Sequence, residues 1–275
     1  MSGNLKFNLI FRVPEADICI KNSDVDFVYY KSSEISANYA NFILWNLDEI
    51  SYRELFHKSF WVNVFSQYSD EPEIPVFSGY IDLKSVERKM YEFSPDYDDV
   101  PTPDMFTKFR LIDSKNIYED LVVNKDYREP ISSMQIIKDC TDLIGVDNVV
   151  ITADIPNKTY NKFKALGHPH KVIYEICKSL KVPVSITDNV VYIGNPDENL
   201  ADGTIQNFNY TNSLEPQYQG NNEALIITDF CPQVNPNNFV KCEFEKMQGL
   251  FPVKSIYSVG NTYRTLCTSK IRIGV

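Results

Sequence analysis

Apolar and polar residues alternate from the start of the chain, which is typical of a half-buried β-strand. From Leu5 to Val13 every odd position is apolar, whereas Lys6, Asn8 and Arg12 are polar. Shorter strand-like runs follow at residues 17–20, 26–30, 40–45, 60–65, 76–86 and 106–112, with Asn, Asp, Ser or Pro between them. Strands at this spacing predict an antiparallel sandwich or barrel.

Helical periodicity appears in three segments. Residues 48–58 predict a short helix with Asp48 as N-cap and Ile50, Leu55 and Phe56 as its apolar stripe. The other two predicted helices lie in residues 129–146, with Pro130 in the first turn and Gly145 at the stop, and from Pro169 until Pro183 ends the pattern. Strand-like residues follow each, at 148–151 and at 184–186 with 190–193, where Asp188-Asn189 predicts a hairpin. The middle of the chain is therefore predicted to be a small α+β unit.

Strand patterns return after Asp202, at 204–210, 224–230, 239–244, 253–259 and 263–273. Gly260-Asn261 predicts the turn of a closing hairpin. The fold class expected is mainly β with a small α+β insert, divided into domains at 1–125, 126–200 and 201–275.

Composition agrees with a β-rich globular protein. The 275 residues are 43% hydrophobic and include 17 Tyr and 17 Phe but only 10 Gly, which excludes disorder and favours strands. The net charge of -10 argues against a surface that adheres to nucleic acid. No run approaches the roughly 20 apolar residues that cross a bilayer, and the first residues do not resemble a signal peptide. We therefore expect a chain that is made in the cytoplasm and does not insert into a membrane.

The sequence offers little chemistry for an enzyme or a cofactor. It contains no GxSxG, GxxxxGK[ST], GxGxxG or HExxH motif, and the six cysteines form no CxxC pair and are expected to be mostly buried thiols. His168 and His170 lack a third ligand at a familiar spacing, so the start of a helix at Pro169 is the favoured interpretation over a metal site. The Asp-rich segment 93–104 lacks the central Gly and final Glu of an EF-hand loop and is interpreted as an exposed acidic loop. We expect no catalytic residue, cofactor or metal.

Three stretches, in order, resemble the hub proteins of bacteriophage tails and baseplates, a family that includes the late control protein D type of contractile tails. The first spans Asn46-Leu47, the strand-like residues 60–68 and the sequence FSGYI at 77–81. The second is the helix and hairpin pattern at 170–196, and the third covers 229–244 with 250–271. Together they cover most of the chain.

The resemblance implies a structural protein with two tube-type β-barrels that flank the helical domain. Three chains would form a ring that adapts a sixfold tail tube to a threefold spike or tip, within the baseplate of the virion tail. Implied partners are the tail tube protein, the spike or tip protein, baseplate wedge proteins and the tape measure protein. DNA would pass through the lumen, and an acidic lining would keep it from adhering.

The residues expected to carry barrel cores and subunit contacts lie in three strands: Phe7, Leu9 and Phe11; Phe77, Gly79, Tyr80 and Ile81; and Tyr257, Val259 and Tyr263. Two alternatives stay open. One is a cell-wall or polysaccharide hydrolase that uses a carboxylate pair, with Asp98 and Asp99 as the residues to test. The other is a different structural tail component, such as a tube terminator, tip or wedge subunit.

Overall fold

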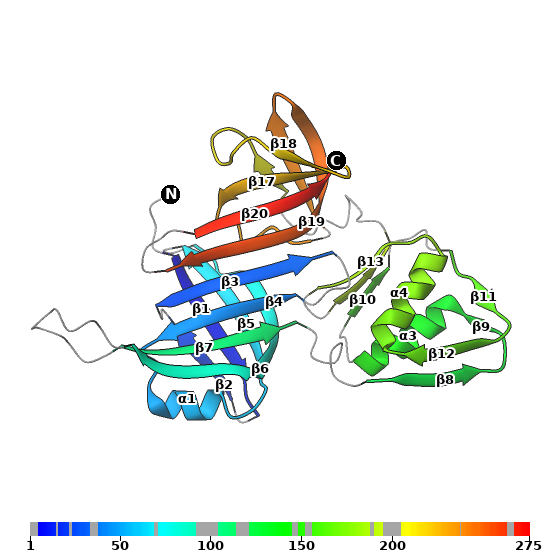
Figure 1. The fold of residues 1–275 in the computed structure, drawn as a ribbon, viewed down its shortest axis with the longest axis horizontal. Coiled ribbons are helices and arrows are strands. Elements are labelled where there is room, and N and C mark those ends of the chain that lie inside the picture. The colour runs from blue at the N-terminus through cyan, green and yellow to red at the C-terminus, as the bar shows by residue number, and fades with distance from the viewer. Residues whose placement is uncertain are drawn as a thin grey trace, which may run out of the picture.

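The computed structural model describes residues 5–14, 16–21, 24–33, 38–68, 71–91, 104–113, 121–144, 148–151, 156–187, 190–194, 205–236, 238–262 and 267–275. Figure 1 shows the strands of the two terminal regions lying together, with an α+β unit from the middle of the chain beside them. The predicted class, mainly β with a small α+β insert, is confirmed.

The N-terminal region consists of antiparallel strands and one helix. Its strands pair in the order β3-β4-β7-β6-β5-β1-β2. Residues that alternate in the sequence alternate in burial, so Phe7, Leu9 and Phe11 of the first strand are buried. The elements are β1 (Leu5–Arg12), β2 (Asp17–Lys21), β3 (Val25–Ser32), β4 (Tyr39–Trp45), α1 (Glu49–Leu55), β5 (Trp61–Tyr68), β6 (Ile74–Tyr91) and β7 (Asp104–Ile112).

Strand β6 is long because it belongs to two ladders in succession. Residues 74–80 pair with β5, and residues 80–82 and 87–91 pair with β7, with a register shift between Asp82 and Glu87. Gly79 lies where the strands meet. A Cβ on Gly79 would lie 2.5 Å from the carbonyl oxygen of Ile112, closer than non-bonded atoms approach. This position therefore requires glycine.

The middle α+β unit has its own core. The apolar faces of its two longer helices meet, and buried residues such as Ile137, Cys140, Ile173 and Ile176 lie between these helices and a three-stranded sheet, β10-β14-β13. The elements are β8 (Val123–Tyr127), β9 (Ile131–Ser132), α3 (Ser133–Ile144), β10 (Asn148–Ile151), β11 (Thr159–Tyr160), β12 (Phe163–Gly167), α4 (Pro169–Ser179), β13 (Val184–Thr187) and β14 (Val190–Ile193).

The C-terminal region continues the sheet of the N-terminal region. Its longest strand, Met247–Asn261, pairs with β3, and this pairing joins both regions into one sheet. Asn221 and Asn222 both have positive φ and form the turn before one of its strands, a conformation that Asn tolerates better than most residues. The strands are β15 (Gln206–Phe208), β16 (Gln217–Gly220), β17 (Glu223–Asp229), β18 (Phe239–Phe244), β19 (Met247–Asn261) and β20 (Cys267–Gly274).

Most local predictions are confirmed, and three are wrong in detail. Asp48 caps α1 as predicted, by accepting a hydrogen bond from the Ser51 amide at 2.9 Å, but Ile50 is 71% exposed because it points away from the core that Leu55 reaches. Pro130 is not in a helix, since the short strand β9 intervenes before α3. Gly260 and Asn261 continue β19 and are paired with neighbouring strands, so the predicted turn is not at these two residues. Strands β13 and β14 pair antiparallel as predicted, whereas Gly145 and Asp188-Asn189 lie outside the described residues.

The three-domain division stays a prediction. The structure adds one fact to it: a single hydrophobic core contains residues of both terminal regions, while the middle unit holds a second core. Among the described residues, the helices are too short and too polar to cross a bilayer.

Candidate functional surface

Eight neighbouring strands of the large sheet form a continuous surface, which we call the wall. In order they are β16, β17, β20 and β19 from the C-terminal region and β3, β4, β7 and β6 from the N-terminal region. Each terminal region thus contributes four strands. Because side chains alternate between the two faces of a strand, one face of the wall covers the core and the other, the outer face, carries the remaining residues.

The two halves of the wall meet at the ladder between β3 and β19. Seven residue pairs, from Ser32 opposite Ser255 to Asp26 opposite Asn261, hold this junction. Two further bonds close its ends: the Ser33 amide donates to the Lys254 carbonyl at 2.7 Å, and the Val25 amide donates to Thr262 Oγ1 at 2.9 Å. The junction is therefore as regular as the ladders within each half.

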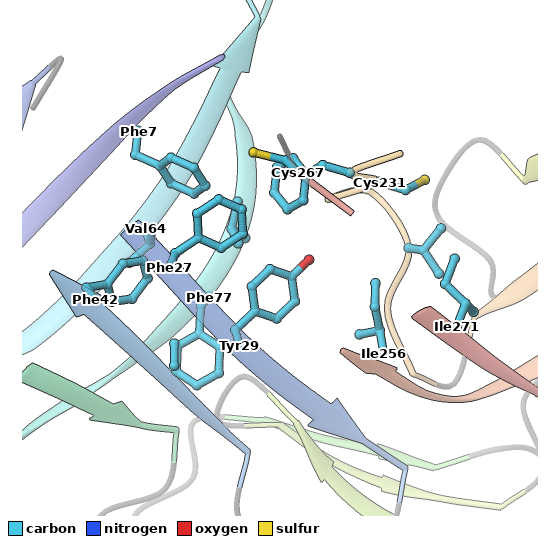
Figure 2. Close-up of a cluster of buried hydrophobic side chains, with 14 of the residues drawn as sticks. Phe7, Phe27, Tyr29, Phe42, Val64, Phe77, Cys231, Ile256, Cys267 and Ile271 are labelled. Atoms are coloured by element: carbon cyan, nitrogen blue, oxygen red, sulfur yellow. The ribbon is translucent and has the colours of Figure 1, made fainter. Parts of the chain in front are cut away.

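Aromatic side chains pack behind this junction and join the two regions (Figure 2). The rings of Phe7 and Phe27 lie 4.7 Å apart, and Phe230 of the C-terminal region lies 5.1 Å from Phe27 and 5.9 Å from Phe7. Contacts of this kind add to the free energy that burial itself contributes, about 0.5–1.5 kcal/mol per pair. The shared core makes the wall one packed body.

The outer face is hollowed across the junction. A hollow of about 750 Å³ is lined by residues of β3, β4, β7, β19 and β20 and by Asp229 at the end of β17. Arg110 is one of the residues that line the hollow. Its Nε donates to Asn41 Oδ1 at 3.0 Å, and its guanidinium lies 5.6 Å from the Tyr39 ring centre. The hollow is lined by charged and apolar residues together, with Asp26, Asp229, Lys108 and Arg110 as the charged ones.

Charge on the outer face is mixed. Among the described residues, acidic side chains (Asp26, Asp82, Glu87, Asp104, Glu223, Asp229) and basic ones (Lys89, Lys108, Arg110, Lys270, Arg272) occur in nearly equal numbers. Some are paired, as are Arg272 with Glu223 at 3.6 Å and Lys89 with Glu87, whose pKa this hydrogen bond lowers. The chain's net charge of -10 is therefore not concentrated here, and the acidic lining expected from composition is not found on this face.

The residues predicted to form cores and contacts fall into two groups. Phe7, Leu9, Phe11, Phe77 and Ile81 have at most 1% of their surface exposed and belong to the core. Tyr80, Tyr257 and Val259 are half-buried on the outer face, and Gly79 lies against Ile112. Tyr263 lies outside the described residues. The structure brings these strands into one sheet. Subunit contact stays a prediction, and only the residues on the outer face are exposed enough to make such a contact.

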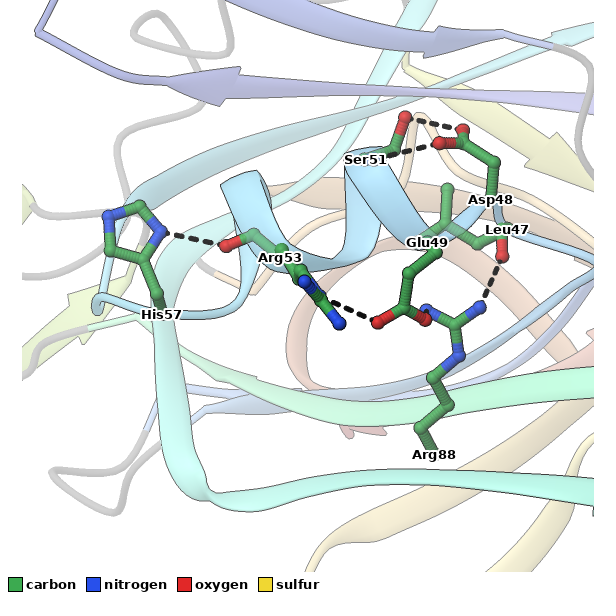
Figure 3. A network of polar contacts seen from close by, with 7 residues as sticks. All are labelled: Leu47, Asp48, Glu49, Ser51, Arg53, His57 and Arg88. Carbon is green, nitrogen blue, oxygen red and sulfur yellow. Dashed lines mark hydrogen bonds and ion pairs between the residues drawn. The ribbon is translucent and has the colours of Figure 1, made fainter.

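Helix α1 is fixed to the wall by a network that the sequence reading missed (Figure 3). Arg88 of β6, whose side chain is only 13% exposed, donates to the Leu47 carbonyl at 2.9 Å and lies 3.0 Å from Glu49. Its guanidinium also lies 4.5 Å from the Tyr52 ring centre. An arginine among polar residues of a long strand gives no sequence signal for this role, because all four groups meet only in the fold.

The other candidate sites show no converging chemistry. The rings of His168 and His170 stack at 5.6 Å, and burial, with His168 and Lys171 nearby, lowers the pKa of His170. Within the described part of the chain, no three His, Cys, Asp or Glu side chains gather as a metal site. Five cysteines are buried and only Cys19 is exposed, in line with the prediction. Most of the acidic loop, residues 92–103, lies outside the described residues.

Comparison with solved structures identifies the fold. The 43 kDa tail protein of prophage MuSo2 from Shewanella oneidensis aligns with a TM-score of 0.65 at 10% identity, over 97% of this chain and 98% of that one. A tail protein from Neisseria meningitidis MC58 aligns with a TM-score of 0.66 at 10% identity, over 98% and 96%. No protein-family model and no curated protein matches the sequence.

A third similar structure comes from a secretion machine. The E. coli c3393 protein, described as a component of the type VI secretion system with structural similarity to the T4 tail proteins gp27 and gp5, aligns with a TM-score of 0.56 at 9% identity, over 96% of this chain and 76% of that one. At such low identity these likenesses show the fold. The chain has the fold of phage tail proteins, as its sequence resemblance predicted.

Proposed function

We propose that this chain is a structural hub of a phage-type tail, located in the baseplate, where three copies close their walls into a ring around a passage for DNA. The fold of phage tail proteins supports a structural role. The observation that carries the hub role is the β3–β19 ladder, which places four strands from each terminal region in one wall.

This ladder makes each chain a double unit. Two four-stranded parts side by side, repeated three times, present six parts around the axis, while the chain itself repeats three times. Such a ring matches a sixfold tail tube on one side and a threefold spike or tip on the other. The tail tube, spike or tip, wedge and tape measure proteins are its proposed partners, and the outer face of the wall is the proposed lining of the passage.

Measurement of mass and shape tests the proposal. Light scattering on the purified chain over a wide concentration range should reach three times the 31.7 kDa of one chain, and negative-stain images should show a threefold ring with a central opening. A chain that stays monomeric at high concentration, even with tube or spike protein added, would contradict the hub role. So would an oligomer without a central passage.

The hydrolase alternative has no support among the described residues. Asp98 and Asp99, on which it was to be tested, lie outside them. Another structural tail role, as terminator, tip or wedge subunit, is separated from the hub by the same mass measurement, because those roles do not require a threefold ring of this chain.

A further inference from the structure

The two ends of the wall are open strand edges within the described part of the chain. At one end, β16 pairs with β17 on one side and with no strand on the other. At the other end, the second half of β6 pairs with β7 only, through residues 87–91, because the β5 ladder stops at Tyr80; residues 83–86 lie at the register shift and are in neither ladder. Open edges expose unpaired backbone N–H and C=O groups and readily accept another strand.

The β16 end also exposes large apolar side chains. Tyr218 faces the core side, since its partner across the ladder, Ala224, is fully buried, yet Tyr218 is 61% exposed. The neighbouring Leu214 is 60% exposed. Both residues line a groove of about 470 Å³ whose floor includes Phe244 and Met247 of the core. The core side of β16, the last strand of the wall, is thus only partly covered by other parts of the described chain.

The β6 end presents an exposed apolar side chain, Met90. Met90 lies on the core side of its strand, alternating with Lys89, which pairs with Phe106 across the ladder. It is nevertheless 55% exposed, and Leu83 in the same half-strand is 43% exposed. Arg88 and its contacts with α1 hold this half of β6 in place. A flexible methionine on a fixed strand edge suits an apolar groove.

We propose that the ring closes head to tail, with β16 of one copy adding to the open half of β6 of the next, so that Met90 of the next copy enters the groove beside Tyr218. The core sides of the two strands then coincide, and the walls continue as one sheet. Two different patches meet in this contact, so it is heterologous and closes into a ring or extends as a filament. This inference rests on the proposed function, since it names the surface through which the copies associate.

Disulfide trapping between two singly substituted chains tests the direction of this contact. In a Cys19→Ser background, which removes the exposed native thiol, one chain carries Met90→Cys and another carries Tyr218→Cys. Mild oxidation of the mixture should give covalent dimers that contain one copy of each variant. Neither variant alone should cross-link to itself, whereas a chain with both substitutions should give a ladder that ends at a closed trimer.

A charge substitution tests the apolar part independently. Leu214→Asp should weaken self-association at least tenfold, whereas the control Leu166→Asp, at an equally exposed apolar residue on β12 of the middle unit, should leave it unchanged. Circular dichroism of both variants checks that the fold is retained.

The outcomes separate this contact from the hub role. A stable trimer without the mixed cross-link overturns the edge assignment and leaves the hub proposal standing. Self-cross-linking of either single variant shows a symmetric contact and overturns the head-to-tail arrangement. A monomer that forms no cross-link in the concentrated mixture overturns both.

Discussion

The two cores of this molecule are built in opposite ways. The core behind the wall brings together residues from both ends of the chain, such as Phe7 and Phe230, whereas the core of the middle unit is assembled from neighbouring segments between Val123 and Ile193. Figure 1 shows the two bodies side by side. Sequence regions and packed bodies therefore differ: three segments predicted as domains make two cores.

A small polar cluster connects the two bodies. Asn38 is fully buried; its Oδ1 accepts from the Ser32 amide at 2.8 Å, and its Nδ2 donates to Asp113 at 2.7 Å and to the Ile186 carbonyl of β13 at 3.2 Å. The comparison teaches that the wall needs both termini for its stability, while the middle unit depends on the wall only through limited contacts. Each prediction below tests this division.

The largest effect is expected from truncating an aromatic residue in the shared core. Phe27→Ala removes the contacts with Phe7 and Phe230 and should cost about 3–5 kcal/mol of unfolding free energy. Both terminal regions should lose protection together in hydrogen exchange, and α3 and α4 should keep theirs. Ile173→Ala, buried in the middle core, is the matched control and should show the reverse pattern.

The native thiols report which core has opened. Burial raises the pKa of Cys140 and Cys177 in the middle core to about 11, and that of Cys231 behind the wall to about 12, so all three react slowly while folded. In Phe27→Ala, alkylation at Cys231 should accelerate while Cys140 and Cys177 stay protected. Equal acceleration at all three would show that the chain unfolds as one unit and that the division is wrong.

A smaller effect is expected at the connection between the bodies. Asn38→Ala removes the buried hydrogen bonds to the Ser32 amide, the Asp113 carboxylate and the Ile186 carbonyl and should cost about 1–3 kcal/mol. Small-angle scattering should show a broader range of distances between wall and middle unit, with both cores intact by thiol labelling. Asn41→Ala on β4, three residues further along the chain and at a half-buried outer position, is the control. An unchanged scattering profile would mean that other contacts place the middle unit.

The smallest effect concerns acid and is confined to the middle unit. Burial opposes ionisation of Asp139, but hydrogen bonds from Lys125, Tyr127 and Gln135 outweigh it and hold the pKa of this carboxyl below its ordinary 3.8. The stabilisation is therefore present above about pH 4 and is lost as the pH falls through the lowered value. Asp139→Asn should lower the stability of the middle unit at pH 7 and flatten its decline below pH 4.

Urea unfolding followed at Cys140 measures this effect. Asp142→Asn, on an exposed position of the same helix, should keep the wild-type acid profile. If Asp139→Asn unfolds with the wild-type dependence on pH, the network around this carboxyl does not stabilise the middle unit.

The sequence predicted local structure well because its signals are local. Alternation located most strands, and the helical pattern from Pro169 to Leu180 matched α4 closely, since each rests on burial of one face. The two-residue strands β9 and β11 were not predicted, because two residues are too few to show a periodic pattern. Ile50 was misplaced because a helix of seven residues has too few turns to define its buried stripe.

The surface was less predictable than the elements. The pairing of β3 with β19 joins segments more than 200 residues apart, and no pattern within either strand specifies its partner. Likewise, Met90 and Tyr218 lie outside the strands that the sequence predicted. Only the ends of their ladders show that they are exposed.

The β3–β19 ladder also constrains how the protein is made. The Val25 amide bonds to Thr262, 237 residues later, so one edge of β3, the edge opposite β4, has no partner until β19 has left the ribosome. The middle unit, whose contacts are closer in sequence, is free to fold while synthesis continues. For that interval the nascent N-terminal half carries an exposed strand edge, and the emergence of β19 is the event that allows it to be covered.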